Sequence, residues 1–534
     1  MRWAQNFIPR LLALTIFFSG AILLFSGSVP SDLARLHWIQ RFVPLPLIEI
    51  SHFLGSLVGV ILLFLAWGLM QRLDSAYFMT LALLVIGAVF SLLKGFNYEE
   101  ASILGLMFFA VLPTRECFFR KGSLIKERMT RGWVLLIALV LVSSVCVGVF
   151  SYKNIVYSDD LWWKFEISDD ASRFLRATVG TAIFILLLSL AKLIQPASPK
   201  FIIPSLQDFK KASEIISRSP VCRACLGLLG DKNFLFNKKQ NAFLMYRIHG
   251  KSWVALGDPI GPKEEWKELA WEFRRLSDLY NGTMAFHEIS REDLPLYLDL
   301  GLTLLKVGEE ARVPLAAFSM DDPFYKEFRN TQKKVEEKGY FFEVIPADQV
   351  PPILPGLKKI STLWLKSRNT REKGFSLGFF DESYLKHFSI GVVRDERSIF
   401  AFANILESAD KDEYSSDLIR YIPQESPKGI MDYLLAHLIS RAKVQGYRWF
   451  NMGMAPLSGL ENRQYAPFWN RLGAFLYSHG ENFYNFRGLR FYKEKFRPVW
   501  EPKYLALPSS FALPRVLSDI AALNSRGVKG IFIK

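Results

Sequence analysis

Residues Ile399–Met452, IFAFANILESADKDEYSSDLIRYIPQESPKGIMDYLLAHLISRAKVQGYRWFNM, combine strand and helix patterns in close succession. Apolar residues dominate 399–407 and 417–422, which predicts two strands separated by a polar loop. Pro427-Lys-Gly429 then opens a helical pattern, and Arg448–Met452 follows it as another strand. The stretch therefore predicts a β-β-α-β unit within an α/β domain.

This order of elements, with a glycine at the entrance of the helix, resembles the GNAT acyltransferases. In that class a Gln/Arg-x-x-Gly-x-Gly/Ala loop precedes the helix, and its backbone N–H groups hold the coenzyme A pyrophosphate. The corresponding Glu425-Ser-Pro-Lys-Gly-Ile-Met431 lacks the second small residue. We therefore expect an acyltransferase scaffold whose acyl donor is not coenzyme A. An earlier block, about 233–345, has similar strand and helix content, which favours two tandem units.

The first third of the chain is strongly apolar and predicts a membrane domain. Six segments are predicted as spans: 8–29, 48–70, 76–94, 98–113, 133–150 and 177–195. Lys and Arg concentrate in the loop 114–132, which places this loop and the part after the last span in the cytoplasm. The expected fold is a transmembrane helical domain (1–196) followed by two GNAT-like units (197–360 and 361–534).

The charge of the 534-residue chain is uneven, with a formal net value of +15. Residues 200–534 hold 49 Lys and Arg against 39 Asp and Glu, a difference of +10. A basic domain beside a membrane domain favours polyanionic partners, namely anionic lipid headgroups or RNA. A solvated, lysine-rich surface is the alternative. Cys222-Arg-Ala-Cys225 lacks a second pair or a nearby His, so we expect no metal site there.

Short motifs follow one another within about residues 230–505: Ala255-Leu-Gly-Asp-Pro-Ile-Gly261, Gly308-Glu-Glu-Ala-Arg-Val313, Glu372-Lys-Gly-Phe-Ser-Leu-Gly378, Asp417-Leu-Ile-Arg420, Asn451-Met-Gly-Met-Ala-Pro-Leu-Ser-Gly-Leu460 and Phe483-Tyr-Asn-Phe-Arg-Gly-Leu-Arg490. Asn97-Tyr-Glu-Glu-Ala101 and Trp162-Trp-Lys-Phe165 extend the set into the membrane half. This ordered set resembles the phosphatidylglycerol lysyltransferase and alanyl-phosphatidylglycerol synthase family, the multiple peptide resistance factors.

The resemblance implies a membrane enzyme of the bacterial cytoplasmic membrane whose tandem GNAT-like units face the cytoplasm. Members take an aminoacyl group, lysyl or alanyl, from aminoacyl-tRNA and esterify it to the glycerol hydroxyl of phosphatidylglycerol. Longer members carry a further membrane region that flips the product lipid, which links the family to cationic peptide and antibiotic resistance. The spans expected here match the membrane part next to the synthase.

The chemistry of this transfer needs no metal and no cofactor, because an aminoacyl ester is already activated. It needs proximity, a proton acceptor and donors for the developing oxyanion. We predict Asp417 and Arg420 at the reacting centre, where Asp417 orients the lipid hydroxyl, receives its proton or binds the donor's amino group. If 417–422 is a strand, the two side chains point to opposite faces. An exposed Asp and an Arg paired elsewhere is the alternative.

The basic, aromatic stretch near the end of the chain is predicted to hold the lipid phosphate. We expect Phe483–Leu489 to be a strand, followed by a short helix or an irregular run. The predicted phosphate ligands are Arg487, Arg490, Lys493 and Lys495. A last core strand with a solvated basic tail, or an RNA-binding surface made by the same cations, is the alternative.

The aminoacyl end of the donor is predicted to meet a second group of polar residues: Asp258, Glu309, Glu310, Tyr384 and Asn485. The Gly-Asp-Pro turn at Asp258 also fits an ordinary turn. Two other functions stay open at this stage. One is a peptidoglycan-precursor aminoacyltransferase that uses aminoacyl-tRNA, and the other is a non-catalytic, lipid-binding membrane protein.

Overall fold

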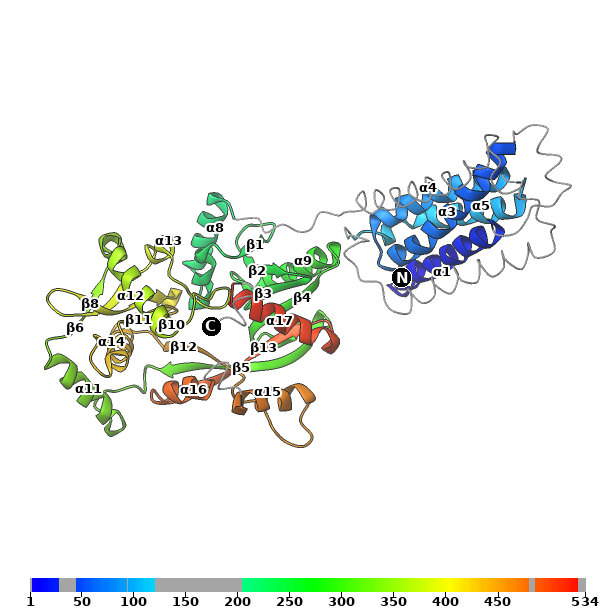
Figure 1. The fold of residues 1–534 in the computed structure, drawn as a ribbon. Helices are drawn as coiled ribbons and strands as arrows, with labels where there is room; N and C mark the ends of the chain where they lie inside the picture. The colour runs from blue at the N-terminus through cyan, green and yellow to red at the C-terminus, as the bar shows by residue number, and fades with distance from the viewer. Residues whose placement is uncertain (1, 28–44, 94, 121–203, 480–485, 527–534) are drawn as a thin grey trace. The chain divides into compact units, whose positions relative to one another are not determined.

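The computed structural model of the chain describes residues 2–27, 45–93, 95–120, 204–479 and 486–526. These residues fall into two compact units divided near residue 200, each of which is described by itself (Figure 1). The first unit is helical. Its elements are Arg2–Gly27 (α1), Leu45–Met70 (α3), Asp74–Leu93 (α4), Tyr98–Val111 (α5) and the 3₁₀ turn Leu112–Cys117 (η1).

Close packing of α1 against α3 depends on two glycines. A Cβ placed on Gly20 would lie 2.7 Å from the carbonyl oxygen of Gly59, and the reverse distance is also 2.7 Å. Small residues at a crossing allow the backbones of apolar helices to approach closely. Among the described residues, two helical segments are long and apolar enough to cross a membrane, Phe7–Ser26 and Asp74–Leu93.

The first four predicted spans coincide with α1, α3, α4 and α5. Helix α5 has 14 residues, fewer than the roughly 20 that a bilayer core requires. The predicted spans 133–150 and 177–195 lie outside the described residues. The number of six spans therefore stays a prediction.

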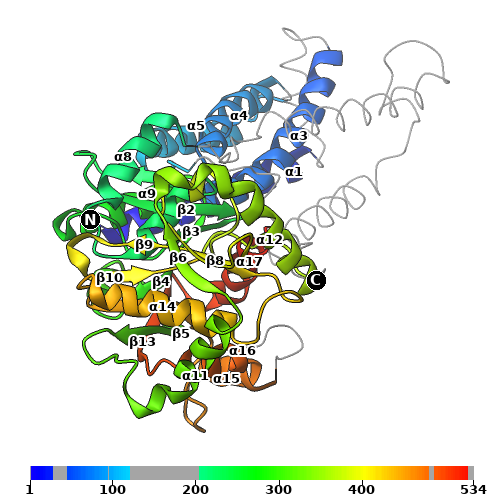
Figure 2. The same cartoon turned by 90° about the vertical axis from the view of Figure 1, so that its left-hand side faces the viewer.

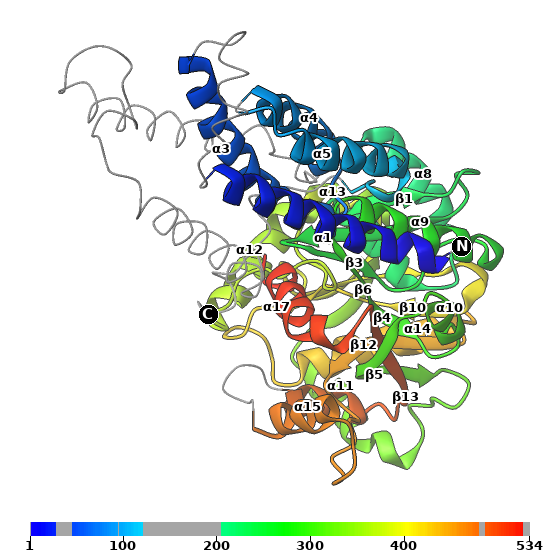
Figure 3. The same ribbon diagram turned by 90° about the vertical axis from the view of Figure 1, so that its right-hand side faces the viewer.

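A nine-stranded mixed sheet forms the centre of the second unit, with the order β1-β2-β3-β4-β13-β5-β12-β10-β9 (Figures 2 and 3). Its strands are Asn233–Phe236 (β1), Phe243–His249 (β2), Ser252–Leu256 (β3), Thr283–Ser290 (β4), Thr303–Pro314 (β5), Leu406–Glu407 (β9), Glu413–Ser415 (β10), Trp449–Pro456 (β12) and Val499–Leu507 (β13). Strands β3 and β4 are parallel, as are β10 and β12. The last strand, β13, lies between β4 and β5, so it joins the end of the chain to the earlier half of the unit.

A second, antiparallel sheet of four strands has the order β11-β8-β7-β6. Its strands are Phe341–Ile345 (β6), Ile390–Arg394 (β7), Ile399–Asn404 (β8) and Ile419–Tyr421 (β11). Val392, Phe402 and Ala403 of this sheet are fully buried, which is why its central strands are almost entirely apolar.

Helices cover both sheets. They are Leu206–Ile216 (α8), Trp266–Leu279 (α9), Leu294–Asp299 (α10), Lys326–Glu336 (α11), Leu354–Ser367 (α12), Glu382–Leu385 (α13), Ile430–Val444 (α14), Phe468–His479 (α15), Phe486–Glu494 (α16) and Leu513–Asn524 (α17), with the 3₁₀ turns Cys222–Leu229 (η2) and Pro323–Tyr325 (η4) among the connections. Helix α14 packs on β7 and β8 (Figure 2), and α17 packs on β2 and β3 (Figure 3).

Several predicted elements are confirmed in the structure. The helix after Gly429 is α14, and Gly429 itself has a φ of 87°, a left-handed conformation that favours glycine. The predicted strand 399–407 is divided, because β8 ends at Asn404 and β9, which starts at Leu406, belongs to the large sheet. The supposed polar loop after it contains a further short strand, β10.

One predicted strand is wrong, and another is confirmed over a shorter range. Residues 486–489 begin helix α16 instead of ending a strand, while 483–485 lie outside the described residues. Strand β11 spans only Ile419–Tyr421, and Asp417 lies in the bend before it. The side-chain oxygen of Asn404 accepts the backbone N–H groups of Asp417 and Leu418 at 3.2 and 3.0 Å, so Asn404 holds this bend.

Candidate functional site

The four neighbouring strands β4, β13, β5 and β12 share an irregular zone. The register shifts within Lys503–Leu505 of β13 and within Asn451–Met454 of β12. Beside these shifts, Glu288 of β4 is buried with a φ of 65°, a left-handed conformation that costs a non-glycine residue about 1–3 kcal/mol. Bulges re-aim side chains and are frequent beside active sites. We therefore locate a candidate site in this zone.

A buried group of four charges lies on one side of the zone; Arg223, Glu288, Glu310 and Lys503 form what we call the Glu310 cluster. Arg223 donates to Glu310 at 2.7 Å and lies 3.4 Å from the carboxylate of Glu288. The ammonium of Lys503 lies 2.9 Å from the other oxygen of Glu310. Although burial works against ionisation, Lys503 and Arg223 hold the pKa of Glu310 well below its usual value. Glu310 is therefore a carboxylate at any physiological pH.

Lys493, on helix α16, also reaches the irregular zone. Its side chain is buried, and its ammonium donates to the carbonyl oxygens of Gly453 at 2.8 Å and Met454 at 2.9 Å. Burial lowers the pKa of Lys493 to about 8, although the carboxylates of Glu310 and Glu288 oppose this shift. A lysine with this pKa can release or accept a proton near neutral pH.

Glu309, the neighbour of Glu310 on β5, points to the opposite face of the strand. It accepts hydrogen bonds from Arg490 and, at 2.7 Å, from Lys306. Burial disfavours its ionised form, yet these two cations lower the pKa of Glu309 below its usual value. Gly459, at φ 64°, lies against it, and a Cβ there would overlap the carboxylate of Glu309. A side chain at this position would therefore displace the carboxylate of Glu309 and strain the backbone.

Asp417 is held by two neutral donors in the bend before β11. The hydroxyl of Tyr384 donates to one carboxylate oxygen at 2.6 Å, and the amide of Asn404 donates to the other at 2.5 Å. Burial nevertheless raises the pKa of Asp417 above its usual value. Tyr384 is itself fully buried, so it would act on the aminoacyl donor indirectly, through its hydrogen bond to Asp417. A carboxyl group with a raised pKa is suited to proton transfer.

Arg420 does not share partners with Asp417. Its guanidinium lies 3.1 Å from the carboxylate of Glu372 and 4.1 Å from the ring centroid of Trp364. Burial lowers the pKa of Arg420 from its usual value, but an arginine remains protonated in proteins. The two predicted catalytic residues therefore lie three positions apart in sequence with separate hydrogen-bond partners.

The remaining predicted residues have different surroundings. Asp258 accepts the hydroxyl of Tyr297 at 2.7 Å and the N–H of Ser290 at 3.0 Å, which ties its turn to β4. Lys495 lies 3.3 Å from Asp432, and Arg487 is an exposed residue in the first turn of α16. Asn485 lies outside the described residues. Within the described part of the chain, no group of three or more His, Cys, Asp or Glu is placed to hold a metal ion.

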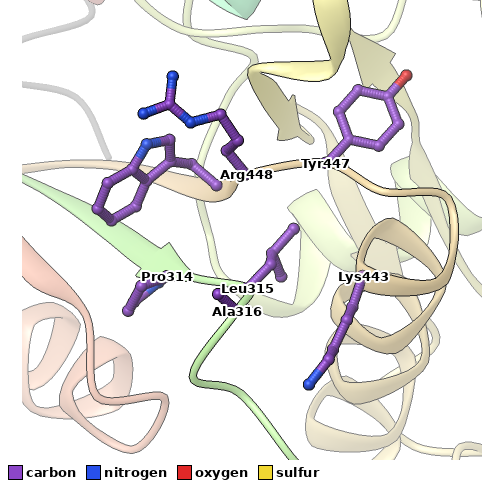
Figure 4. Close-up of a pocket in the computed structure, with 7 residues that line it drawn as sticks. Pro314, Leu315, Ala316, Lys443, Tyr447 and Arg448 are labelled. Carbon is purple, nitrogen blue, oxygen red and sulfur yellow. The ribbon is translucent and has the colours of Figure 1, made fainter.

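A shallow pocket of about 380 Å³ lies elsewhere on the second unit (Figure 4). Its lining residues are Pro314, Leu315, Ala316, Lys443, Tyr447, Arg448 and Trp449. The cations at this pocket are held by protein groups, because Lys443 donates to the carbonyl oxygen of Phe318 and Arg448 donates to Asp412 at 2.9 Å. None of the predicted site residues lines it.

Three members of the Glu310 cluster were missed by sequence reasoning: Arg223, Glu288 and Lys503. Glu288 and Lys503 are charged residues within strands that hold several buried apolar residues, and an inward charge in such a strand is a usable indication of a buried ion pair. Arg223 lies between Cys222 and Cys225, and nothing in the local sequence marks it as the partner of a buried carboxylate. Both thiols, Cys222 and Cys225, are buried, and burial raises their pKa values.

The bulged central strands of the second unit carry buried acid–base groups of the kind that acyl transfer uses. The match to known families makes the class specific. Residues 214–507 match the model of the family described as phosphatidylglycerol lysyltransferase, C-terminal. The chain belongs to the phosphatidylglycerol lysyltransferase family, as the ordered motifs predict.

Similar proteins cover the chain to different extents. A phosphatidylglycerol lysyltransferase of Bacillus subtilis is 33% identical over 528 residues, which are 97% of this chain and 60% of that protein. One of Staphylococcus aureus is 37% identical over 292 residues, which are 54% of this chain and 34% of that protein. The solved structure of L-PGS from Bacillus licheniformis is 35% identical, with a TM-score of 0.56, and covers 62% of this chain and 100% of that chain. The chain thus spans less than two thirds of the length of these curated relatives.

Proposed function

We propose that the chain transfers an aminoacyl group, lysyl or alanyl, from aminoacyl-tRNA to the glycerol hydroxyl of phosphatidylglycerol at the cytoplasmic face of a bacterial inner membrane. The observation that carries the proposal is Lys493, a buried lysine with a pKa of about 8 beside bulged strands of a GNAT-like fold. Membership of the phosphatidylglycerol lysyltransferase family supports the lipid as acceptor. The multi-pass membrane domain of the proposal is supported by the apolar helices of the first unit.

The proposed step is an ester exchange. The lipid hydroxyl oxygen attacks the aminoacyl carbonyl carbon, the bond from this carbon to the tRNA ribose oxygen breaks, and the proton of the hydroxyl ends on that ribose oxygen. Asp417, whose raised pKa suits proton transfer, orients the hydroxyl and carries this proton. Arg420, fixed by Glu372 and Trp364, offers positive charge to the developing oxyanion.

The lipid phosphate is assigned to the cations of α16 and the residue that follows it: Arg487, Arg490, Lys493 and Lys495. Arg490 and Lys493 stand beside the carboxylates of Glu309 and Glu310, so a phosphate must compete with existing partners. The aminoacyl end is assigned to Glu309 and Glu310, whose lowered pKa values keep them anionic for the donor's amino group. Tyr384 and Asp258 support this end as hydrogen-bonding groups, and Asn485 is assigned with them from its motif.

Lipid analysis of cells tests the proposal. The full chain is expressed in a bacterial host whose membrane contains phosphatidylglycerol but no aminoacylated lipid, and extracted lipids are examined by mass spectrometry. We expect lysyl- or alanyl-phosphatidylglycerol with the wild-type chain and none with Asp417→Asn at equal expression. An aminoacylated peptidoglycan precursor without aminoacylated lipid would support the competing acceptor and overturn the proposal.

A further inference from the structure

Helix α16 has two different faces. One faces the protein, where the side chain of Lys493 is 5% exposed. On the other, Phe491 is 75% exposed, although burial of a phenylalanine side chain is worth about 1.5–3 kcal/mol. Arg487 and Glu494, about one helical turn before and after it, are exposed as well. An exposed ring on an amphipathic helix is a feature of surfaces that bind a lipid interface.

A second exposed ring lies near the end of the same segment. Phe324 of η4 is 44% exposed, and the guanidinium of Arg497 lies 3.7 Å from its ring centroid. Lys495, one helical turn after Phe491, has a side chain that is 38% exposed. We call Arg487, Phe491, Lys495, Arg497 and Phe324 the α16 face. In Figures 1 and 2, α16 lies beside α11, which follows η4 directly.

The charge of this segment is mostly positive. Residues 486–497 contain five cations and one anion. Arg490 pairs with Glu309 on the inner side of the helix. Two of the outer cations also have carboxylate partners, because Lys495 lies 3.3 Å from Asp432 and Arg497 lies 3.2 Å from Asp322. Exposed pairs of this kind are weak in water, so both cations can still attract an anionic surface.

We propose that the α16 face docks on the surface of an anionic bilayer, with Phe491 inserted between the lipid headgroups. The inference deepens the proposed function, on which it rests for the presence of a lipid substrate. A helix surface is convex and suits insertion into an interface, whereas a single-stranded nucleic acid is held in a groove. The combination of an exposed ring with flanking cations therefore favours the bilayer over RNA.

Docking through this face also explains how the site reaches its lipid. Phe491 and Lys493 are on opposite sides of one helix, which is only about 10–12 Å across. When Phe491 enters the headgroup layer, Lys493 and Arg490 come within a helix diameter of the phosphates. The face thus delivers phosphatidylglycerol to the inner side of the same helix without extraction of the lipid into water.

A fluorescent probe in the full chain tests the docking. Phe491→Cys is labelled with an environment-sensitive fluorophore in a chain whose Cys117 and Cys146 are replaced by Ser, since Cys222 and Cys225 are buried. The protein is placed in nanodiscs of phosphatidylglycerol and phosphatidylcholine that contain acyl chains with a quencher. The matched control is Val444→Cys, an 87% exposed position at the end of α14.

We expect the probe at position 491 to shift to shorter wavelength and to be quenched at least threefold more than the probe at 444. Discs of pure phosphatidylcholine, or high salt, reduce the difference. Equal quenching at both positions overturns the proposal. A response at 491 to added tRNA in phosphatidylcholine discs, without quenching by lipid, assigns the face to RNA and also overturns it.

Lipid kinetics give a second measurement that separates docking from folding. Phe491→Ser should raise the half-saturating content of phosphatidylglycerol in bilayers about fivefold to tenfold. With a short-chain, monomeric phosphatidylglycerol the same variant should match the wild type within twofold. An equal loss with both lipids contradicts docking. If the probe at 491 is quenched but the chain makes no aminoacylated lipid, the docking is supported and the proposed function is refuted.

Discussion

Replacement of Lys493 by methionine should make the protein more stable near neutral pH and less active. The pKa of this lysine falls from 10.5 to about 8 in the fold, and about 1.4 kcal/mol corresponds to each pKa unit. Burial of the protonated lysine therefore costs about 3 kcal/mol. Methionine removes this cost but leaves the carbonyl oxygens of Gly453 and Met454 without their donor, at about 1–3 kcal/mol. The net change is a gain of about 0–2 kcal/mol at pH 7.

The pH dependence of this effect has a defined sign. Below pH 8 the lysine is protonated in both the folded and the unfolded chain, so the full cost is present. Between pH 8 and 10.5 the unfolded chain binds a proton that the folded chain has released, so the stability of the wild type rises with pH. The methionine variant lacks this rise, and its advantage should disappear toward pH 10.5.

Thermal unfolding of the full chain in mild detergent, from pH 7 to 10, measures the difference between variant and wild type. About 1 kcal/mol corresponds to roughly 2 °C in a unit of this size. Lipid aminoacylation by the variant should fall at least a hundredfold, because the lipid phosphate loses one of its assigned cations. A variant that is less stable by the same amount at every pH, or that retains wild-type activity, would show that Lys493 is a structural lysine of ordinary pKa and refute the reasoning.

Other substitutions test the neighbouring groups. Glu310→Gln leaves Arg223 and Lys503 buried without their common carboxylate, so the free energy of unfolding in denaturant should fall by about 3–5 kcal/mol. Glu309 is less buried, and Glu309→Gln should lower this free energy by less than half as much. Gly459→Ala places a Cβ against Glu309, so the activity should fall at least tenfold and the free energy of unfolding by about 1–2 kcal/mol. An unchanged rate would show that the position of Glu309 is unimportant. Arg420→Lys keeps the charge but loses the stacking on Trp364, so kcat should fall while the tRNA requirement stays constant; a higher tRNA requirement would assign Arg420 to donor binding.

Local elements of the fold are predictable where one local rule is enough. Helix α14 follows from Gly429 and an apolar periodicity, and β3 follows from a short apolar run between turns. The start of α16 is different, because an aromatic and cationic stretch with Gly488 inside it alternates like a strand. Its helical state is stabilised by tertiary contacts, among them the bonds of Lys493 to the β12 backbone.

Long-range pairing is what the sequence does not reveal. Nothing in Val499–Leu507 indicates that this strand lies between β4 and β5, two strands from far earlier in the chain. The same holds for the candidate site, where predicted Glu310 meets Arg223 and Lys503 only through this insertion. Glu310 was predictable from its motif, whereas its partners Arg223 and Lys503 were not, because they depend on the sheet order.

The requirement for charged tRNA and phosphatidylglycerol together is the most direct test of the proposed function. The purified full chain is incubated with phosphatidylglycerol vesicles and with lysyl-tRNA or alanyl-tRNA whose amino acid is radiolabelled. Label should enter the lipid fraction with at least one charged tRNA, and it should not enter when vesicles lack phosphatidylglycerol or when free amino acid and ATP replace the tRNA. Labelling that persists without phosphatidylglycerol, or no labelling with either charged tRNA, would contradict aminoacyl transfer to this lipid.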